Sequence, residues 1–519
     1  MSLFPMNARG MRAWLMQVGA AGLGAAMVAG CGSTYRPVVT STNPSGPASQ
    51  PSSLAVILSN PSSTADGIAT IVDYSGDTVM ATASLGPNPQ AFSLDASGST
   101  GYTINSDGTL TSFTASTSLQ QKNVAYSTLP STASPAGMFS PSTGMWVTDL
   151  AADEVDVLTG SPLTLKSPIP VAATPVSVFG SSANSKRYFA VSLNNSSTPS
   201  GSAIPFTDMT CNTAPSTVTQ NGEVDTLEVS SYAVSAQIPV GKCPVYALEN
   251  GDGSRLFVLN RGSDTISVIN TQTNALDSCT PFLNQAGQTV NCHPTIPLST
   301  AAVQATTIEP VNSDANLPAV AGPVYAEYNV ATETLVVADY DGGTVSIIDV
   351  SMDIYGNDSS TFGTTYTVKV GKTSTPNPAA VTVLYAGDRA YTANQADDSG
   401  NTGNGSVSII NLTSHTLEKT LTVVGHPRTV VSTSNSLYGK VYVASPDSEY
   451  VTIIDVSQDA VDTTVLVQGN VMDVRTSTQN GISGNAITTS RRPGAGQPCN
   501  LPGTTATASP DNCKAVSLE

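Results

Sequence analysis

Short apolar segments separated by turns recur along most of this chain. The pattern is clearest in Gly241–Ser278, where apolar segments of about four to six residues end at clusters of Gly, Asp, Asn and Ser. The Asp252-Gly253 pair is a strong hairpin signal, because its tight turn needs backbone angles that glycine tolerates. Strand-forming residues bounded by such clusters are typical of β-strands. This stretch therefore predicts a small antiparallel meander of three or four strands.

The same meander recurs from residue 54 to residue 475. Its cores resemble one another: LFVLN with TISVIN, LVVAD with TVSIID, AYTAN with SVSIIN, and VYVAS with VTIID. Repeats of roughly 40–50 residues with four strands each are typical of a β-propeller, whose blades must stack to bury their apolar surface. We therefore predict an all-β fold, a β-propeller of four-stranded antiparallel blades. Our count gives eight blades, with seven as the alternative.

The two ends of the repeat array predict how the ring closes. The first unit, from Leu54, has only three strands and lacks the innermost one. The segment Asn470–Arg475 (NVMDVR) follows the last full unit, where a new inner strand would start. We expect this C-terminal strand to complete the N-terminal blade, within a propeller that spans residues 54–476.

The N-terminus has the features of an export signal. Arg9 and Arg12 precede an apolar run, Trp14–Gly30. The box Val28-Ala29-Gly30-Cys31 resembles the bacterial lipoprotein lipobox, which implies cleavage before Cys31 and lipid attachment to it. Ordinary signal cleavage beside a stray cysteine is the alternative. We predict a signal peptide at 1–30, a flexible lipidated tether at 31–53, and an irregular Gly/Ser/Pro-rich tail at 477–519.

These features predict an exported protein anchored by lipid to the cell envelope, at the outer membrane if the organism has one. The sequence is also strongly acidic, with a formal net charge of −18. An acidic chain without a basic stripe is repelled by nucleic acid, so we exclude nucleic-acid binding. We expect a monomer.

Two stretches carry a family resemblance. Gly241-Lys242-Cys243-Pro244 is followed by FVLN and VIN, and Gly425-His426-Pro427 is followed by VYVAS and IID. This order resembles the YVTN-type β-propeller repeat of exported bacterial proteins. The resemblance implies the propeller fold, but its members include many binding and surface proteins, so it indicates the fold better than the function.

Six cysteines remain after Cys31, an even number that suggests disulfides in an exported chain. Pairing between neighbours is the simplest of about fifteen connectivities, with free buried thiols as the alternative. The predicted pairs are Cys211–Cys243, Cys279–Cys292 and Cys499–Cys513. No Cys-x-x-Cys motif occurs, which gives no support to zinc, thioredoxin-like or c-haem chemistry.

The sequence offers little catalytic chemistry. Its three histidines, His293, His415 and His426, do not lie at metal-ligand spacing, and no Gly-x-Ser-x-Gly elbow occurs. We therefore expect no cofactor and favour a protein that is not an enzyme. The acid-rich turns at 339–343 and 397–400 offer oxygen ligands for Ca²⁺, although turn formation is the favoured interpretation.

Loops on one face of the propeller predict where a ligand would bind. Second-to-third-strand loops and blade-to-blade loops share a face, and loops held by a rigid scaffold are the usual place for binding. The alternative is a scatter of solvated turn residues. The predicted ligand face comprises Lys242, Arg261, Asp339, Asn394, His426, Arg428 and Asp447, with insertions at 194–221 and 396–405.

Taken together, these patterns predict a lipid-anchored propeller that acts as a binding or protein-interaction scaffold. Its expected partners are the membrane, through the N-terminal lipid, and an envelope protein, a glycan or a small anionic ligand. The alternative is a lactonase-like propeller hydrolase with a cation in its central channel.

Overall fold

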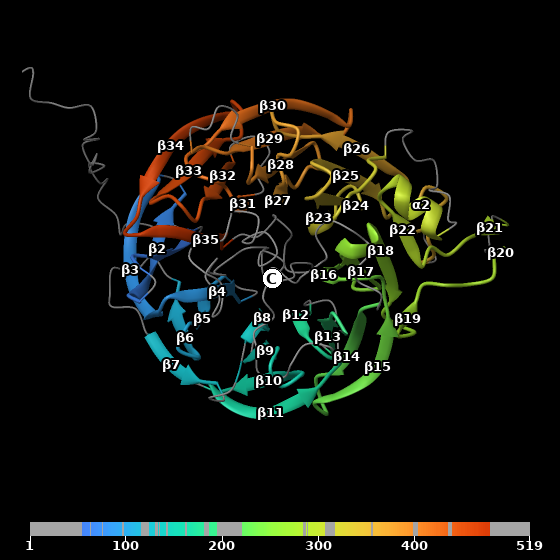
Figure 1. The fold of residues 1–519 in the computed structure, drawn as a ribbon, viewed down its shortest axis with the longest axis horizontal. Coiled ribbons are helices and arrows are strands. Elements are labelled where there is room, and N and C mark those ends of the chain that lie inside the picture. The colour runs from blue at the N-terminus through green and yellow to red at the C-terminus, as the bar shows by residue number, and fades with distance from the viewer. Residues whose placement is uncertain are drawn as a thin grey trace, which may run out of the picture. The chain divides into compact units, whose positions relative to one another are not determined.

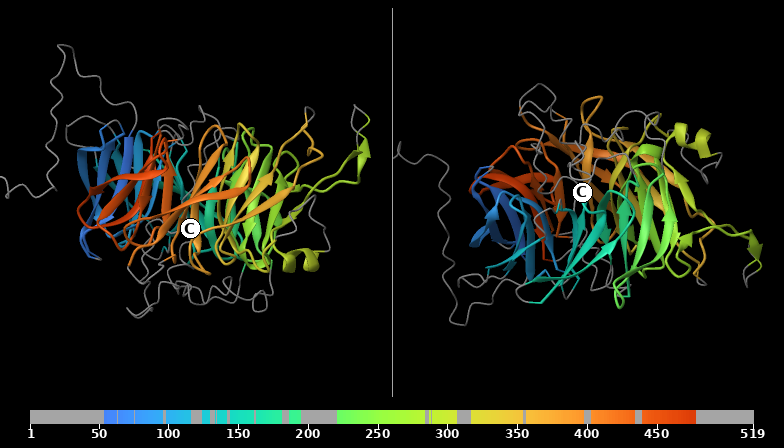
Figure 2. Two further views of the ribbon diagram at one scale, coloured as in Figure 1. Left: turned by 90° about the horizontal axis from the view of Figure 1, so that it is seen from above. Right: turned by 60° about the horizontal axis from the view of Figure 1, so that its bottom comes forward.

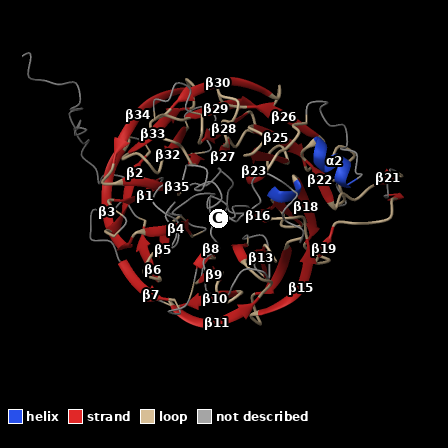
Figure 3. Ribbon diagram, viewed as in Figure 1, coloured by secondary structure: helices blue, strands red, loops and turns tan. Residues whose placement is uncertain are grey.

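Eight antiparallel sheets follow one another along the chain and stand as blades around a ring (Figures 1 and 2). Strands dominate, and the few helical turns lie at one side of the ring (Figure 3). The predicted eight-bladed β-propeller is therefore confirmed. The computed structural model describes residues 54–477, except 63, 75, 96–97, 116–123, 130–132, 134, 142–143, 161–162, 181–185, 195–220, 284–286, 288, 307–316, 354–355, 398–402 and 434–438.

The predicted signal peptide and tether, including Cys31, lie outside the described residues. So does the predicted tail from residue 478 onward, with Cys499 and Cys513.

The first four blades contain four strands apiece, named from the innermost strand outward. Blade 1 contains β35 (Asn470–Thr476), β1 (Leu54–Asn60), β2 (Asp66–Asp73) and β3 (Thr78–Pro87). Blade 2 contains β4 (Pro89–Leu94), β5 (Thr100–Asn105), β6 (Thr109–Thr114) and β7 (Val124–Thr128). Blade 3 contains β8 (Pro135–Phe139), β9 (Met145–Asp149), β10 (Glu154–Thr159) and β11 (Thr164–Pro170). Blade 4 contains β12 (Pro175–Phe179), β13 (Arg187–Ser192), β14 (Glu223–Glu228) and β15 (Ala233–Pro239).

The other four blades follow the same order, although blade 5 has a fifth strand. Blade 5 contains β16 (Pro244–Glu249), β17 (Arg255–Asn260), β18 (Thr265–Asn270), β19 (Ala275–Leu276) and β22 (Thr295–Pro297). Blade 6 contains β23 (Pro323–Asn329), β24 (Thr334–Asp339), β25 (Thr344–Asp349) and β26 (Thr365–Lys369). Blade 7 contains β27 (Pro378–Val383), β28 (Arg389–Asn394), β29 (Ser406–Asn411) and β30 (Thr416–Thr422). Blade 8 contains β31 (Thr429–Ser432), β32 (Lys440–Ala444), β33 (Tyr450–Asp455) and β34 (Ala460–Leu466).

The ring closes inside blade 1, as predicted. β35 pairs antiparallel with β1, with Val56 opposite Arg475 and Ile57 opposite Val474. β35 also contacts β31 of blade 8 and β4 of blade 2. This strand therefore joins blades 1 and 2 to blade 8. Backbone hydrogen bonds between the two ends of the array therefore hold the circle together.

The burial of the strands explains the apolar pattern of the sequence. Inner strands such as β16 and β27 are buried at every residue, whereas the outermost strand β30 is largely exposed. Side chains alternate between the two faces of a blade, and both faces of an inner strand pack against neighbouring blades. Inner strands therefore appear as continuous apolar runs. One apolar cluster extends without a break from blade 4 to blade 8.

Candidate functional site

The outer edge of blade 5 is interrupted by an excursion of the chain. β19 pairs with one end of β18, with Leu276 opposite Ile269, and β22 pairs with the other end, with Ile296 opposite Ile266. Between them the chain leaves the blade and forms a two-stranded hairpin, β20 (Phe282–Leu283) and β21 (Thr289–Val290). We name residues 278–292 the blade-5 hairpin. Figure 1 shows β20 and β21 well outside the rim of the ring.

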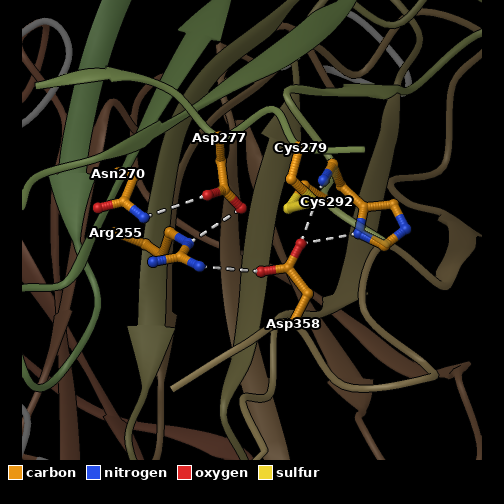
Figure 4. The surroundings of a disulfide bond; sticks show 7 residues. Arg255, Asn270, Asp277, Cys279, Cys292 and Asp358 are labelled. Atoms are coloured by element: carbon orange, nitrogen blue, oxygen red, sulfur yellow. Dashed lines mark hydrogen bonds and ion pairs between the residues drawn. A yellow bond between two sulfur atoms is a disulfide. The ribbon is translucent and has the colours of Figure 1, made fainter. Parts of the chain in front are cut away.

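A disulfide closes the base of the blade-5 hairpin (Figure 4). Cys279 and Cys292 are bonded, with their Cα atoms 5.5 Å apart. This confirms one of the three predicted pairs. Cys243 is also disulfide-bonded, and Cys211, its predicted partner, lies outside the described residues. A two-stranded hairpin alone is marginally stable, so the covalent link compensates for its lack of a core.

A buried ion network fixes the same base to two blades (Figure 4). Arg255 of β17 donates from Nε to Asp277 at 3.2 Å and from Nη2 to Asp358 at 3.3 Å. Asp358, which lies between β25 and β26 of blade 6, also accepts the backbone N–H of His293 and contacts its Nδ1 at 2.8 Å. Burial, and then the charge of Asp358, raises the pKa of Asp277. Removing one member of such a network would leave an uncompensated buried charge.

Aromatic packing completes the attachment. The ring of His293 stacks on Phe362 of blade 6 at 5.2 Å between centroids, and Phe362 lies 6.5 Å from Phe257 of β17. Covalent, ionic and aromatic contacts therefore all hold the hairpin base against blades 5 and 6.

The outer part of the hairpin exposes apolar side chains. Phe282 is 43% exposed, and Leu283, at 68%, is the most exposed large apolar side chain among the described residues. The sequence from Ser278 to Cys292 contains no aspartate, glutamate, lysine or arginine. A fixed base thus presents an uncharged, partly apolar surface on a strongly acidic protein.

Most residues of the predicted ligand face lie inside the fold. Arg261 is buried and makes a two-pronged ion pair with Asp341, from Nε and Nη2 at 2.9 Å each. This pair joins blade 5 to blade 6. Four of the seven predicted residues are buried, namely Arg261, Asp339, Asn394 and Arg428.

The other three predicted residues are more accessible. Half-buried Lys242 lines a cavity of about 540 Å³ between blade 5 and α2 (Thr300–Thr306). His426 contacts the half-exposed Asp447 through Nδ1 at 2.5 Å, and its backbone N–H donates to the same carboxylate. Partial burial opposes ionisation of Asp447, but these hydrogen bonds from His426 lower its pKa. The structure thus separates Lys242 from the His426–Asp447 pair by placing them on different blades.

The acid-rich turns have partners within the chain. Asp341 is held by Arg261, and Asp397 accepts the backbone N–H groups of Lys372 and Thr373 as well as the hydroxyl of Ser406. Asp398 lies outside the described residues. These contacts join each aspartate to a separate segment of the chain, and they occupy carboxylate oxygens that a Ca²⁺ ion would need.

Comparisons with known proteins support the fold. No protein-family model matches the sequence, and no curated protein matches it. Two structures of AztD from Citrobacter koseri are similar, one of them in the apo form, with TM-scores of 0.51 and 0.50. They share 10% and 11% identity, over 82% of this chain and 97% of theirs. A putative 6-phosphogluconolactonase from Bacteroides fragilis has a TM-score of 0.46 and 13% identity, over 84% of this chain and 99% of its own. At these identities the AztD likeness is one of fold alone.

None of the helices in the described part of the chain has the length and apolar character needed to cross a membrane.

Proposed function

We propose that this protein is a lipid-anchored scaffold of the cell envelope that binds a partner protein through the blade-5 hairpin. The observation that carries the proposal is the exposure of Phe282 and Leu283 on a hairpin whose base is fixed by a disulfide. Exposed apolar side chains are common singly, but Phe282 and Leu283 are consecutive in β20 and so expose apolar surface on both faces of a covalently supported projection, which is a typical protein-binding feature.

The rigid base supports binding because it lowers the entropic cost of association. A loop that is already ordered loses less conformational freedom when a partner binds it. The cystine, the Arg255–Asp358 contact and the stacking of His293 all restrict the hairpin before any partner arrives.

The charge distribution indicates the chemistry of the partner. The protein carries a net charge of −18, yet its hairpin is uncharged. A partner whose apolar pocket encloses the hairpin can therefore bury Phe282 and Leu283, which point to opposite faces of β20, without desolvating carboxylates. We expect the rim of that pocket to be basic, because it must approach an acidic ring.

The anchor can be tested separately from the hairpin. Cys31→Ser should move the protein from the membrane fraction to the soluble fraction without changing its melting temperature, because residue 31 precedes the ring. Retention of Cys31→Ser in the membrane fraction would contradict lipid anchoring at this residue.

A photo-crosslinker placed at Leu283 in the full chain, in its native envelope, tests the hairpin. We expect a discrete crosslinked product that disappears when Phe282 is changed to Ser. The matched control is a crosslinker at Leu466 on β34, which is 57% exposed but lies on a blade surface. The same products from Leu283 and Leu466, or crosslinks from Leu283 to lipid only, would contradict a protein-binding hairpin.

The lactonase-like alternative places its site in the channel, where inner-strand carboxylates would act. Glu327 of β23 is buried, and its Oε2 accepts the backbone N–H of Val383 on the next inner strand at 2.9 Å. This contact ties blade 6 to blade 7 and favours a structural role for Glu327. Lactone hydrolysis by the purified chain that is lost in Glu327→Gln would favour the hydrolase instead.

A further inference from the structure

Several blades share a buried polar group of three residues. The last residue of the second strand lies opposite the first residue of the third strand, and the third strand adds another side chain two positions later on the same face. In blade 5, Asn260 donates to Thr265 at 3.2 Å and to Ser267 at 2.9 Å. Blades 6 and 7 repeat the arrangement with Asp339, Thr344 and Ser346, and with Asn394, Ser406 and Ser408.

Blade 3 has carboxylates at all three of these positions. Asp149 ends β9 and lies opposite Glu154 of β10, and Asp156 follows two residues later. One ligand oxygen from each lies within 4.8 Å of the others. The two hydroxyl side chains, which accept from asparagine in blades 5 and 7 and donate to Asp339 in blade 6, are thus replaced by carboxylates. Three carboxylates meet where those blades carry one or none.

Within the described part of the chain, Asp156 has no partner that would compensate for its burial. Its side chain is 0% exposed, and neither carboxylate oxygen has a hydrogen bond among the described residues. It shares its face with Val147, which packs in the apolar cluster between blades 2 and 3. Burying an unpaired carboxylate costs several kcal/mol in general, so the site requires a proton or a cation.

Blade 4 shows that an aspartate at this position can be satisfied in another way. Asp225 occupies the place of Asp156, and its Oδ2 accepts the backbone N–H of Ala172 at 2.7 Å. Asp156 has no such contact among the described residues, and the side chains beside it on the sheet are carboxylates.

We propose that Asp149, Glu154 and Asp156 bind a Ca²⁺ ion in blade 3. Three hard oxygen ligands without nitrogen or sulfur suit Ca²⁺ better than a transition metal. Ca²⁺ holds its ligands at about 2.3–2.6 Å, so oxygens up to about 5 Å apart can bind one ion. The shorter bonds of Mg²⁺ require two opposite ligand oxygens to lie about 4 Å apart. Glu154 is only partly buried and leaves a route for the ion and for the waters that complete its coordination.

Ca²⁺ titration of the full chain, purified with chelator, tests the site. We expect about one Ca²⁺ per chain and a rise in melting temperature, with a Kd on the order of 10⁻⁴ M. The double variant Glu154→Thr with Asp156→Ser gives blade 3 the residue set of blade 6, so it should fold. It should neither bind Ca²⁺ nor gain stability from it.

The control is Asp225→Asn, which alters the equivalent residue of blade 4 and should leave the Ca²⁺ response unchanged. In chelator, the double variant should melt at a higher temperature than the native chain, because it removes two of the three clustered carboxylates. Absence of a Ca²⁺ response in the native chain, an equal response in the double variant, or a response to Zn²⁺ but not to Ca²⁺ would overturn the proposal.

Discussion

The surroundings of Asp339 in blade 6 change the pKa of its carboxyl group. It is completely buried, accepts hydrogen bonds from Ser346 at 2.6 Å and Thr344 at 3.2 Å, and has one oxygen without a partner among the described residues. Burial is the main reason that its pKa is raised from 3.8 to about 8. At the equivalent position, blades 5 and 7 carry a neutral asparagine.

Asp339→Asn should therefore stabilise the protein in a pH-dependent way. Asp339 has a higher pKa in the folded protein than in the unfolded chain, where it is 3.8. Its carboxyl group therefore contributes stability below pH 3.8, and that stability is lost as the pH rises toward about 8. The variant should melt close to the native chain near pH 4 and a few degrees above it at pH 8.5. The converse variant, Asn394→Asp, should lose melting temperature relative to the native chain as the pH rises. A difference in melting temperature between Asp339→Asn and the native chain that stays the same at all pH values would contradict this account.

Arg261 gives a second prediction at the residue scale. Its guanidinium is almost fully buried against Asp341, and its Cζ atom lies 5.0 Å from the centre of the Tyr340 ring. Arg261→Ala should cost about 3 kcal/mol of unfolding free energy, since it leaves Asp341 largely buried and without its ion-pair partner. Adding Asp341→Ala should restore part of the loss in urea unfolding. A double variant no more stable than the single one would show that the buried charge is not the cause.

At the scale of an element, the blade-5 hairpin depends on its base rather than on its own strands. Among its described residues, the two strands share two pairs, Phe282 with Val290 and Leu283 with Thr289. The stability of the hairpin must therefore come from the disulfide and from the contacts of Asp358 and His293.

Replacing both Cys279 and Cys292 by Ser should loosen this element more than the ring. The disulfide closes a loop with a sequence separation of 13 residues, for which the chain-entropy model gives about 3 kcal/mol. We expect faster hydrogen exchange at residues 278–292, with exchange in β27 and β28 of blade 7 unchanged. Unchanged exchange in the hairpin would show that the ion network alone holds it.

For the whole molecule, the decisive contact is the closure of the ring by β35. Each blade packs on two neighbours, and β35 contacts strands of blade 8 and of blade 2 as well as β1 of its own blade. Val474, which lies opposite Ile57, is 0% exposed. Opening the ring at this point would uncover the faces of two blades at once.

Val474→Asp should lower the stability of the entire protein, because it buries a charge in the closing strand. We expect a large fall in melting temperature and rapid proteolysis of the N-terminal blade. The matched control is Val461→Asp on β34, where the native side chain is 40% exposed and the same change should be tolerated. Similar melting of the two variants would contradict a dominant role for closure.

The sequence by itself determined the strands, their grouping into eight blades and the closure. The strands and blades depend on alternation, turn residues and repeat spacing, which are local properties of the chain. The closure joins distant residues, but it was predictable because the first repeat lacks one strand and the array ends with one extra strand. The pairing of Cys279 with Cys292 was predictable for the same reason, since the two residues flank one short excursion. The three carboxylates of blade 3 were missed, although aligning the repeats position by position would have revealed them opposite the hydroxyls of other blades.

Tertiary structure alone decided which polar turn residues are accessible. Arg261 and Asp339 stand beside turns in the sequence, where polar residues are ordinarily solvated, but both are buried in the folded ring. The partner of Arg261 lies 80 residues away along the chain. The split outer strand of blade 5, with its hairpin fixed by Asp358 of the next blade, likewise depends on contacts between blades. Such contacts join residues that are distant in sequence, so no local pattern of side chains encodes them.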